Sequence, residues 1–298
     1  MAKFALLLAI LASIATSVLH VMPAQAPNAH SWMANVPSEN GGIAGAKDRN
    51  TGASNALFNN PVSSPDHIVV VVEENHGYSQ IIGNPDAVYI NTLAKTGALF
   101  TNYHGVTHPS EGNYFALFSG STQGVTDDGT YFFPNTPTLA GKLQQGGGSF
   151  VGYAEPPAER DHSPWQSFGD AENTGQAFSQ FPTDFSKLPT VSFVVPNLLD
   201  NMHDGTIARG DQWLNANLSA YADWTRMHNS LLVVTFDEDQ GTTSNQVATI
   251  VVGARVGAAQ NDHLMNHYAL LHTIETLYGL PALGESATAP VMSFAPAP

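Results

Sequence analysis

Carboxylate, amide and imidazole side chains directly follow three apolar runs of the chain. The runs, each with the polar residues after it, are Ile68–Val72 with Glu73-Glu74-Asn75-His76, Val191–Val195 with Asn197, Asp200, His203 and Asp204, and Leu231–Phe236 with Asp237-Glu238-Asp239. Any one such group could be helix caps or solvated loop residues. Three groups at equivalent positions favour one shared site, because ligands of open α/β sheets bind beyond the carboxyl ends of the strands. Carboxylates brought together repel one another unless a cation lies among them, so the pattern predicts a divalent metal with oxygen and nitrogen ligands.

A serine offers a nucleophile for this site. Ser110 precedes the apolar stretch 115–118 and is predicted to lie at a helix N-terminus, where backbone N–H groups and the helix dipole favour anions. The alternative is a plain serine N-cap. A serine near a divalent cation can be activated without a Ser-His-Asp triad. The chain around Ser110 lacks the G-x-S-x-G elbow of ordinary esterases, and it contains neither a P-loop nor a dinucleotide-binding glycine motif.

Short strands and longer helices would position these residues. Buried strands of a parallel sheet are predicted at Ile68–Val72, Phe150–Tyr153, Val191–Val195, Leu231–Phe236 and Val247–Val252. Helices are predicted at Gly112–Phe118, Thr138–Gln145, Asp211–Met227 and His267–Tyr278. Strands that alternate with helices indicate an α/β fold with helices on both faces of the sheet.

The composition excludes several classes of function. The chain has 298 residues, of which 43% are hydrophobic, enough to form a core. With 10 Lys and Arg against 25 Asp and Glu, the net charge is -15, which argues against binding to nucleic acid or to anionic lipid. The absence of cysteine removes disulfides, thiolate metal sites and cysteine nucleophiles, so the 12 histidines are the main near-neutral acids and bases.

The two ends of the chain differ in composition from its middle. Residues 1–26 have a lysine near the start, an apolar stretch and the small-x-small pattern Ala24-Gln25-Ala26, which predicts a secretory signal peptide and a secreted protein in the extracellular space or a bacterial envelope. The apolar stretch is shorter than the roughly 20 residues of a spanning helix, so we expect no stable membrane insertion. We expect a flexible lead-in at 27–65, the catalytic domain at 66–286 and a loose Ala/Pro-rich tail at 287–298.

The order of the motifs resembles the secreted bacterial and fungal phosphoesterases that include acid phosphatases and phosphatidylcholine-type phospholipases C. The resemblance covers roughly residues 66–284. Its motifs, in chain order, are Glu74-Asn75, His108-Pro109-Ser110 with Asn113-Tyr114, His162-Ser163-Pro164, Val195-Pro196-Asn197, Met202-His203-Asp204, Thr235-Phe236-Asp237-Glu238 and Asn266-His267-Tyr268. These enzymes belong to the alkaline-phosphatase-like superfamily, so the resemblance implies a three-layer α/β sandwich with a mostly parallel central sheet.

The resemblance also implies residue roles. The metal ligands would be Glu74, Asn75, Ser110, Asp237 and Glu238, holding calcium, magnesium, manganese or zinc. The metal-bound serine of this set would be the nucleophile that forms a phosphoserine.

Further roles concern the phosphate and a second metal. Asn113 would hold a phosphate oxygen, and His162 and His203 would contact the phosphate, with one of them protonating the leaving group. A second metal site, held by only some relatives of this kind, would use Asp200, Asp204 and His267.

The sequence departs from the usual pattern of these enzymes in three places. Glu111-Gly112 stands where Gln-Pro is common, Asp161 separates Arg160 from His162, and His272 takes a position that is commonly Arg. The second departure bears most on the site, because it affects the assignment of His162.

The function expected from this resemblance is a metal-dependent acid phosphatase that hydrolyses small phosphomonoesters. A phospholipase C or phosphodiesterase of the same fold is one alternative, and a non-catalytic surface protein that kept the fold is another. The short chain and its lack of a basic or aromatic membrane-docking stretch favour the monoesterase. The oligomeric state is left open by the sequence.

Overall fold

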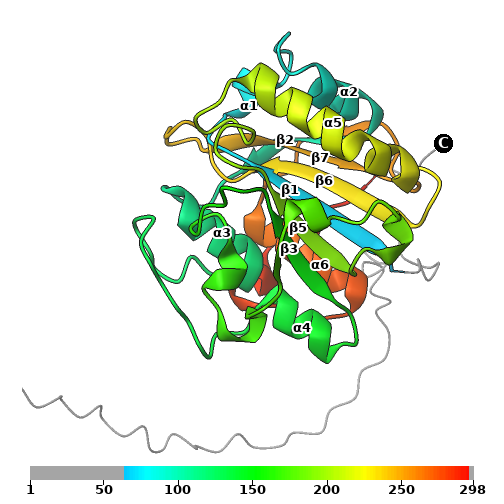
Figure 1. The fold of residues 1–298 in the computed structure, drawn as a ribbon. Helices are drawn as coiled ribbons and strands as arrows, with labels where there is room; N and C mark the ends of the chain where they lie inside the picture. Colours follow the sequence, from blue (N-terminus) through cyan, green and yellow to red (C-terminus); the bar gives the residue numbers. More distant parts are fainter. Residues whose placement is uncertain (1–63, 295–298) are drawn as a thin grey trace, which may run out of the picture. The chain divides into compact units, whose positions relative to one another are not determined.

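The computed structural model describes residues 64–294, and their centre is one nine-stranded sheet (Figure 1). Its strand order is β4-β3-β5-β1-β6-β7-β2-β8, with β9 paired to β2. The signal peptide predicted at 1–26, the lead-in as far as residue 63 and the last four residues of the tail lie outside the described residues. Those predictions stay predictions.

The elements have the following bounds. The strands are β1 (His67–Glu73), β2 (Ala98–His104), β3 (Phe150–Ala154), β4 (Gly175–Ala177), β5 (Val191–Val195), β6 (Ser230–Phe236), β7 (Gln246–Val252), β8 (Ala259–Asn261) and β9 (Met265–Asn266). The α-helices are α1 (Tyr78–Ile81), α2 (Val88–Thr96), α3 (Ser110–Ser119), α4 (Leu139–Gln145), α5 (Ile207–Thr225) and α6 (His267–Tyr278), joined by five short 3₁₀ turns, of which the first is η1 (Pro164–Gln166).

All five predicted strands and four predicted helices are present, but one strand runs in the unexpected direction. β1 pairs in parallel with β5 and β6, whereas β7 is antiparallel to both β6 and β2. The prediction of a parallel strand at Val247–Val252 is therefore wrong in direction. Only residues 237–245 join β6 to β7, and a parallel crossover needs a dozen or more residues. Strand β2 was not predicted, because Thr101 and Asn102 interrupt its apolar run.

The helices form a layer on each face of the sheet, as predicted. Helices α2 and α5 pack against each other, and α3 packs against α4 and α6; Figure 1 shows the two groups on opposite sides of the sheet. The α5 residue Asp211 ties its layer together by accepting hydrogen bonds from the backbone N–H groups of Tyr89 (2.9 Å) and Ile90 (2.8 Å) in α2. No helix among residues 64–294 is long and apolar enough to cross a membrane.

The sheet centre forms the core and fixes where the loops meet. Residues 68–72 of β1 are almost completely buried between β5 and β6. Because β3, β5, β1 and β6 are parallel, the loops that follow them leave from the same edge of the sheet. The polar groups that the sequence places after these strands therefore gather there.

The described part of the tail is packed, contrary to our expectation of a loose segment at 287–298. Met292 is 3% exposed, and its backbone N–H donates to Thr273 Oγ1 of α6 at 2.8 Å. The ring of Phe294 meets Phe100 of β2 edge-on, with centroids 6.2 Å apart. Two apolar side chains within an Ala/Pro-rich stretch are enough to attach it to the core.

We predict that Met292→Ala lowers the free energy of unfolding by about 2–4 kcal/mol, because truncating a buried methionine loses apolar contacts and leaves a cavity. Urea denaturation followed by circular dichroism measures the loss. Met227→Ala is the matched control, because Met227 is 86% exposed. Equal stability of the two variants would contradict the packed tail.

Candidate active site

The register of β1 and β6 brings the first acidic residues of the site together. Glu73 and Phe236 are partners at the ends of these strands, so Glu74 and Asp237 leave the sheet side by side. The backbone N–H of Asp237 donates to Glu73 O at 3.0 Å. Asn75 turns the chain with a φ of 50°, a left-handed conformation that asparagine tolerates, and its N–H lies 3.3 Å from Asp237 Oδ1.

Ser110 is the first residue of α3, and its hydroxyl faces this acidic group. The N-cap residue is Pro109, and the Ser110 side chain makes no capping bond. Ser110 Oγ instead lies 3.3 Å from Glu74 Oε2, to which it donates, and 3.5 Å from Asn75 Oδ1. The alternative of a plain serine cap is therefore excluded, and the hydroxyl stands at the positive end of the α3 dipole.

The acidic side chains of the site are buried, and burial raises their pKa values. Burial raises the pKa of Glu74 to about 8, with a contribution from the charge of Glu238. Burial raises the pKa of Glu238 to about 7, and that of Asp237 well above its usual value, the latter helped by the charges of both glutamates. Ionised carboxylates at this spacing are costly unless positive charge offsets them.

The donor set suits a divalent cation. Asp237 Oδ2 is buried and has no hydrogen-bond partner in the described structure. Carboxylate, amide and hydroxyl oxygens converge here, and these are ligands of hard divalent cations. Within residues 64–294 no three histidine or carboxylate side chains are already arranged around one ligation point. The residue types therefore fit a metal ion, and in this structure their side chains contact one another.

Asn113 lies one turn of α3 after Ser110 and joins the site to the preceding loop. Its Oδ1 accepts from the N–H groups of Val106 (2.7 Å) and Thr107 (3.0 Å). Its Nδ2 donates to Thr107 O (2.9 Å) and to Glu238 Oε2 (3.1 Å). Asn113, the predicted phosphate contact, thus lies at the site, and both its amide oxygen and its amide nitrogen are hydrogen-bonded.

The structure places His162 in the site and His203 beside it. His162 Nε2 lies 3.5 Å from Glu74 Oε1, and its ring stacks on Tyr114 with centroids 5.3 Å apart. His162 keeps this place although Asp161 separates it from Arg160 in the sequence. Oδ2 of Asp161 lies 3.6 Å from the same nitrogen. The more exposed His203 has its ring centroid 6.0 Å from that of His162.

Two residues without a predicted role, Tyr114 and His108, contact the acidic group. The hydroxyl of Tyr114 donates to Glu74 Oε1 and opposes the rise of that carboxyl's pKa. His108 Nδ1 lies 3.0 Å from Glu238 Oε2. Tyr114 follows Ser110 by four residues, a spacing that puts both on one helix face, so helix periodicity could have found it.

Residues from two of the sequence departures, Arg160 and Glu111, form an ion pair. The Arg160 guanidinium donates to Glu111 Oε1, to Gly129 O, and to Ser167 Oγ at 2.8 Å. Glu111 is fully buried, and burial raises its pKa to about 7 against the opposing effect of Arg160. The pair joins the His162-bearing loop to α3.

The three residues predicted for a second metal are not brought together around one point. Asp200 forms an ion pair with Arg209, with Nε at 2.7 Å from Oδ1, and this guanidinium holds the pKa of Asp200 below its usual value. Asp204 accepts at 2.8 Å from His203 Nδ1. His267 is engaged elsewhere, as described next.

His267 acts as a support for Asp237. It is buried, its Nε2 lies 2.5 Å from the backbone carbonyl of Asp237, and its Nδ1 lies 3.0 Å from the hydroxyl of Tyr103. Only one arrangement of protons satisfies both contacts of a neutral ring: Nε2–H donates to the carbonyl and Nδ1 accepts from the tyrosine. Both nitrogens are thereby used within the protein. Burial lowers the pKa of His267 to about 4, which keeps the ring neutral.

We predict that His267 lowers the free energy of unfolding as the solution becomes acidic. Its pKa is about 4 when folded and about 6.5 when unfolded, so between these values the unfolded chain binds more protons and stability falls as pH falls. Between pH 7 and pH 5 this group should cost about 2 kcal/mol.

Urea unfolding of the wild type and of His267→Gln at both pH values isolates the effect, because the other titrating groups are common to both proteins. The wild type should lose about 2 kcal/mol more than the variant on acidification. Equal losses would show that His267 is not held neutral by burial.

Comparisons with known proteins agree with this geometry. The sequence profile of the Phosphoesterase family matches residues 84–281. A phosphatidylinositol-3-phosphatase of Mycobacterium tuberculosis is 45% identical over 240 residues, which cover 75% of this chain and 80% of that protein. An acid phosphatase of Aspergillus fumigatus is 29% identical over 233 residues, covering 64% of this chain and 51% of that protein. The chain therefore spans about half the length of the fungal enzyme.

Solved structures share the fold at low sequence identity. A Vibrio parahaemolyticus protein of the alkaline phosphatase superfamily aligns with a TM-score of 0.55 at 12% identity, covering 77% of this chain and 71% of that one. The lipoteichoic acid synthase LtaP of Listeria monocytogenes aligns with a TM-score of 0.58 at 7% identity, covering 77% and 74%. These likenesses confirm the predicted fold class.

Proposed function

The chain belongs to the Phosphoesterase family and is a phosphoric ester hydrolase, and on that premise we propose that it is a secreted, metal-dependent acid phosphatase. It would cleave phosphomonoesters through a phosphoserine on Ser110. Curated relatives named as phosphatases support the monoester class. Secretion rests on the signal-peptide pattern of residues 1–26.

One observation carries the proposal: a buried serine hydroxyl at a helix N-terminus faces a carboxylate pair. Ser110 Oγ stands 3.3 Å from Glu74 Oε2, and Asn75 and Asp237 lie beside it. A phosphoryl group bears negative charge on its oxygens, so a site for it must supply positive potential. The α3 N-terminus supplies part of that potential.

A divalent cation would be held by Glu74, Asn75, Asp237 and Glu238 together with Ser110, whose oxygens converge at the site. When bound, it would favour the ionised serine and neutralise charge on the phosphoryl oxygens. The unpartnered Oδ2 of Asp237 and the raised carboxyl pKa values support this assignment, because a cation would relieve both.

The reaction we propose has two displacements. Ser110 Oγ gives its proton to Glu74 Oε2, which lies 3.3 Å away, and attacks phosphorus as the bond to the leaving alcohol breaks. His162, held against Tyr114 and Glu74, gives a proton to the departing alkoxide. Water then gives a proton to His162 and attacks the phosphoserine, while Ser110 Oγ leaves phosphorus, takes its proton back from Glu74 and so frees inorganic phosphate.

Three chromogenic substrates test the proposed activity. The mature protein should hydrolyse p-nitrophenyl phosphate in preference to bis-p-nitrophenyl phosphate and p-nitrophenyl phosphorylcholine, and a chelator should abolish the activity. Assays from acidic to alkaline pH locate the optimum. Dominant cleavage of the diester or the choline ester would indicate a phosphodiesterase or phospholipase C, and no cleavage with any added metal would indicate a non-catalytic protein.

We predict that Ser110→Ala lowers kcat for p-nitrophenyl phosphate by at least about 10³-fold, because the variant lacks the attacking oxygen. The fold should persist, since the Ser110 side chain caps no helix. Ser186→Ala, at an exposed serine, is the control and should keep full activity. Residual activity near the wild-type level in Ser110→Ala would remove this serine as the nucleophile.

A further inference from the structure

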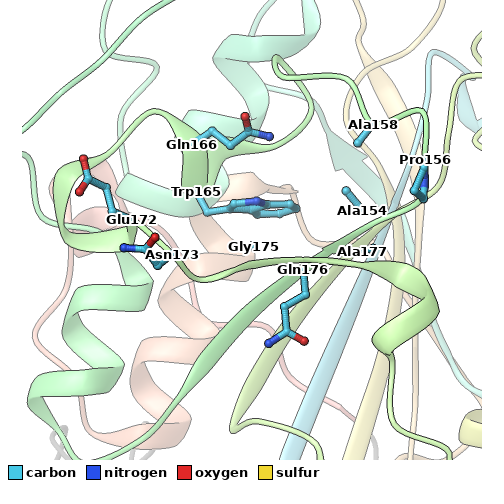
Figure 2. A pocket seen from close by; sticks show the side chains of 10 residues that line it. All are labelled: Ala154, Pro156, Ala158, Trp165, Gln166, Glu172, Asn173, Gly175, Gln176 and Ala177. Carbon is cyan, nitrogen blue, oxygen red and sulfur yellow. The ribbon is translucent and has the colours of Figure 1, made fainter.

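A pocket of about 570 Å³ lies on the edge of the sheet that carries the site, between the end of β3 and β4 (Figure 2). Its volume falls within the range of small-molecule sites. No part of the proposed reaction uses it. Its lining includes Trp165, Gln166, Glu172, Asn173, Gly175 and Gln176.

A tryptophan held on two glycines forms the centre of the lining. Gly152 of β3 and Gly175 of β4 are paired across the strands. A Cβ atom at either glycine would collide with the indole of Trp165, so the ring lies across the backbone of both. Figure 2 shows this ring in the middle of the pocket. The glycine pair thereby fixes a flat apolar surface, and substitution of either glycine would displace it.

The polar side chains of the pocket are open to solvent. Gln166, Glu172, Asn173 and Gln176 are exposed, and within residues 64–294 none of them makes a side-chain hydrogen bond. Amide side chains both donate and accept, which matches the hydrogen-bonding capacity of hydroxyl groups. The lining contains no Lys, Arg or His and has one carboxylate. Such a lining accepts a neutral, hydroxyl-rich molecule and disfavours a second phosphate.

The pocket is fixed to the catalytic loop. Trp165 follows His162 by three residues, so their Cα atoms are at most about 11 Å apart. The intervening turn is tied by bonds from Ser163 N to Arg160 O (3.0 Å) and from Gln166 N to Ser163 O (2.9 Å). Arg160 closes the same segment by donating to Ser167 Oγ. One loop, held by these hydrogen bonds, therefore carries both the proposed proton donor and the tryptophan of the pocket.

We propose that this pocket binds the alcohol portion of the substrate and that this portion is a neutral polyol or sugar. The inference rests on the proposed phosphomonoesterase activity and names its substrate class. C–H faces of the polyol pack on Trp165, and its hydroxyl groups bond to Gln166, Asn173 and Gln176. Glu172 accepts from hydroxyls and repels anionic substituents, so the single reacting phosphate is the only charged group the substrate brings.

The test compares kcat/KM for D-glucose 6-phosphate and glycerol 2-phosphate with kcat/KM for p-nitrophenyl phosphate. Gln166→Leu and Gln176→Leu remove polar contacts at nearly constant volume. Each should lower kcat/KM for the two polyol phosphates about five- to tenfold, mainly through KM, and leave p-nitrophenyl phosphate within about twofold. Gln144→Leu, at an exposed residue of α4, is the matched control and should change neither.

A second comparison tests the charge of the pocket. Wild-type enzyme should cleave D-glucose 6-phosphate with a higher kcat/KM than D-glucose 1,6-bisphosphate, because no cation lines the pocket. Glu172→Gln should narrow this difference. A preference for the bisphosphate would overturn the assignment of a neutral ligand.

The outcomes separate the two proposals. No hydrolysis of p-nitrophenyl phosphate by the wild type would overturn the phosphatase activity and the substrate assignment with it. Hydrolysis of p-nitrophenyl phosphate together with either no turnover of both polyol phosphates, or turnover that the two pocket variants leave unchanged, would overturn the pocket assignment alone.

Discussion

Mutual repulsion among buried carboxylates at the ends of β1 and β6 is the constraint on which the site depends. Strand register holds Glu74 and Asp237 together, with Glu238 next in the chain; burial raises the pKa of all three, and the charge of Glu238 adds to the rise for the other two. Such an arrangement costs free energy unless it is compensated. Tyr114 provides part of the compensation with a hydrogen bond. In the reaction we propose, the remaining negative potential would hold a divalent cation where the phosphate would bind.

The neighbouring Glu73 shows how the strand separates two acidic environments. Successive residues of a strand point to opposite faces of the sheet. Glu73 is fully buried, neither of its carboxylate oxygens has a partner in the described structure, and burial with the charge of Asp211 on α5 raises its pKa well above the usual value. Glu74 instead meets Ser110 of α3. The alternation of side chains at the end of β1 thus decides which of the two carboxylates belongs to the site.

The sequence predicted the parts of this fold that are continuous and apolar. The runs that became β1, β5 and β6 could be recognised, and so could the acidic residues after them. The direction of β7 follows from the short connection between β6 and β7, which the apolar pattern of the strand does not reveal. The pairing of Arg160 with Glu111 joins residues 49 positions apart, and nothing local in the sequence signals it. The second metal set stays a prediction, and residue type alone could not reveal that Asp200 forms an ion pair with Arg209.

The most direct test is the metal content of the purified protein after equilibration with Ca²⁺, Mg²⁺, Mn²⁺ or Zn²⁺ and gel filtration, measured by elemental analysis. We expect at least one ion per wild-type chain for one of these metals, and a loss of most of it in Asp237→Asn. Asp86→Asn, at an exposed carboxylate, should retain the wild-type content. Active enzyme without a stoichiometric metal, or unchanged content in Asp237→Asn, would contradict a cation held among these carboxylates.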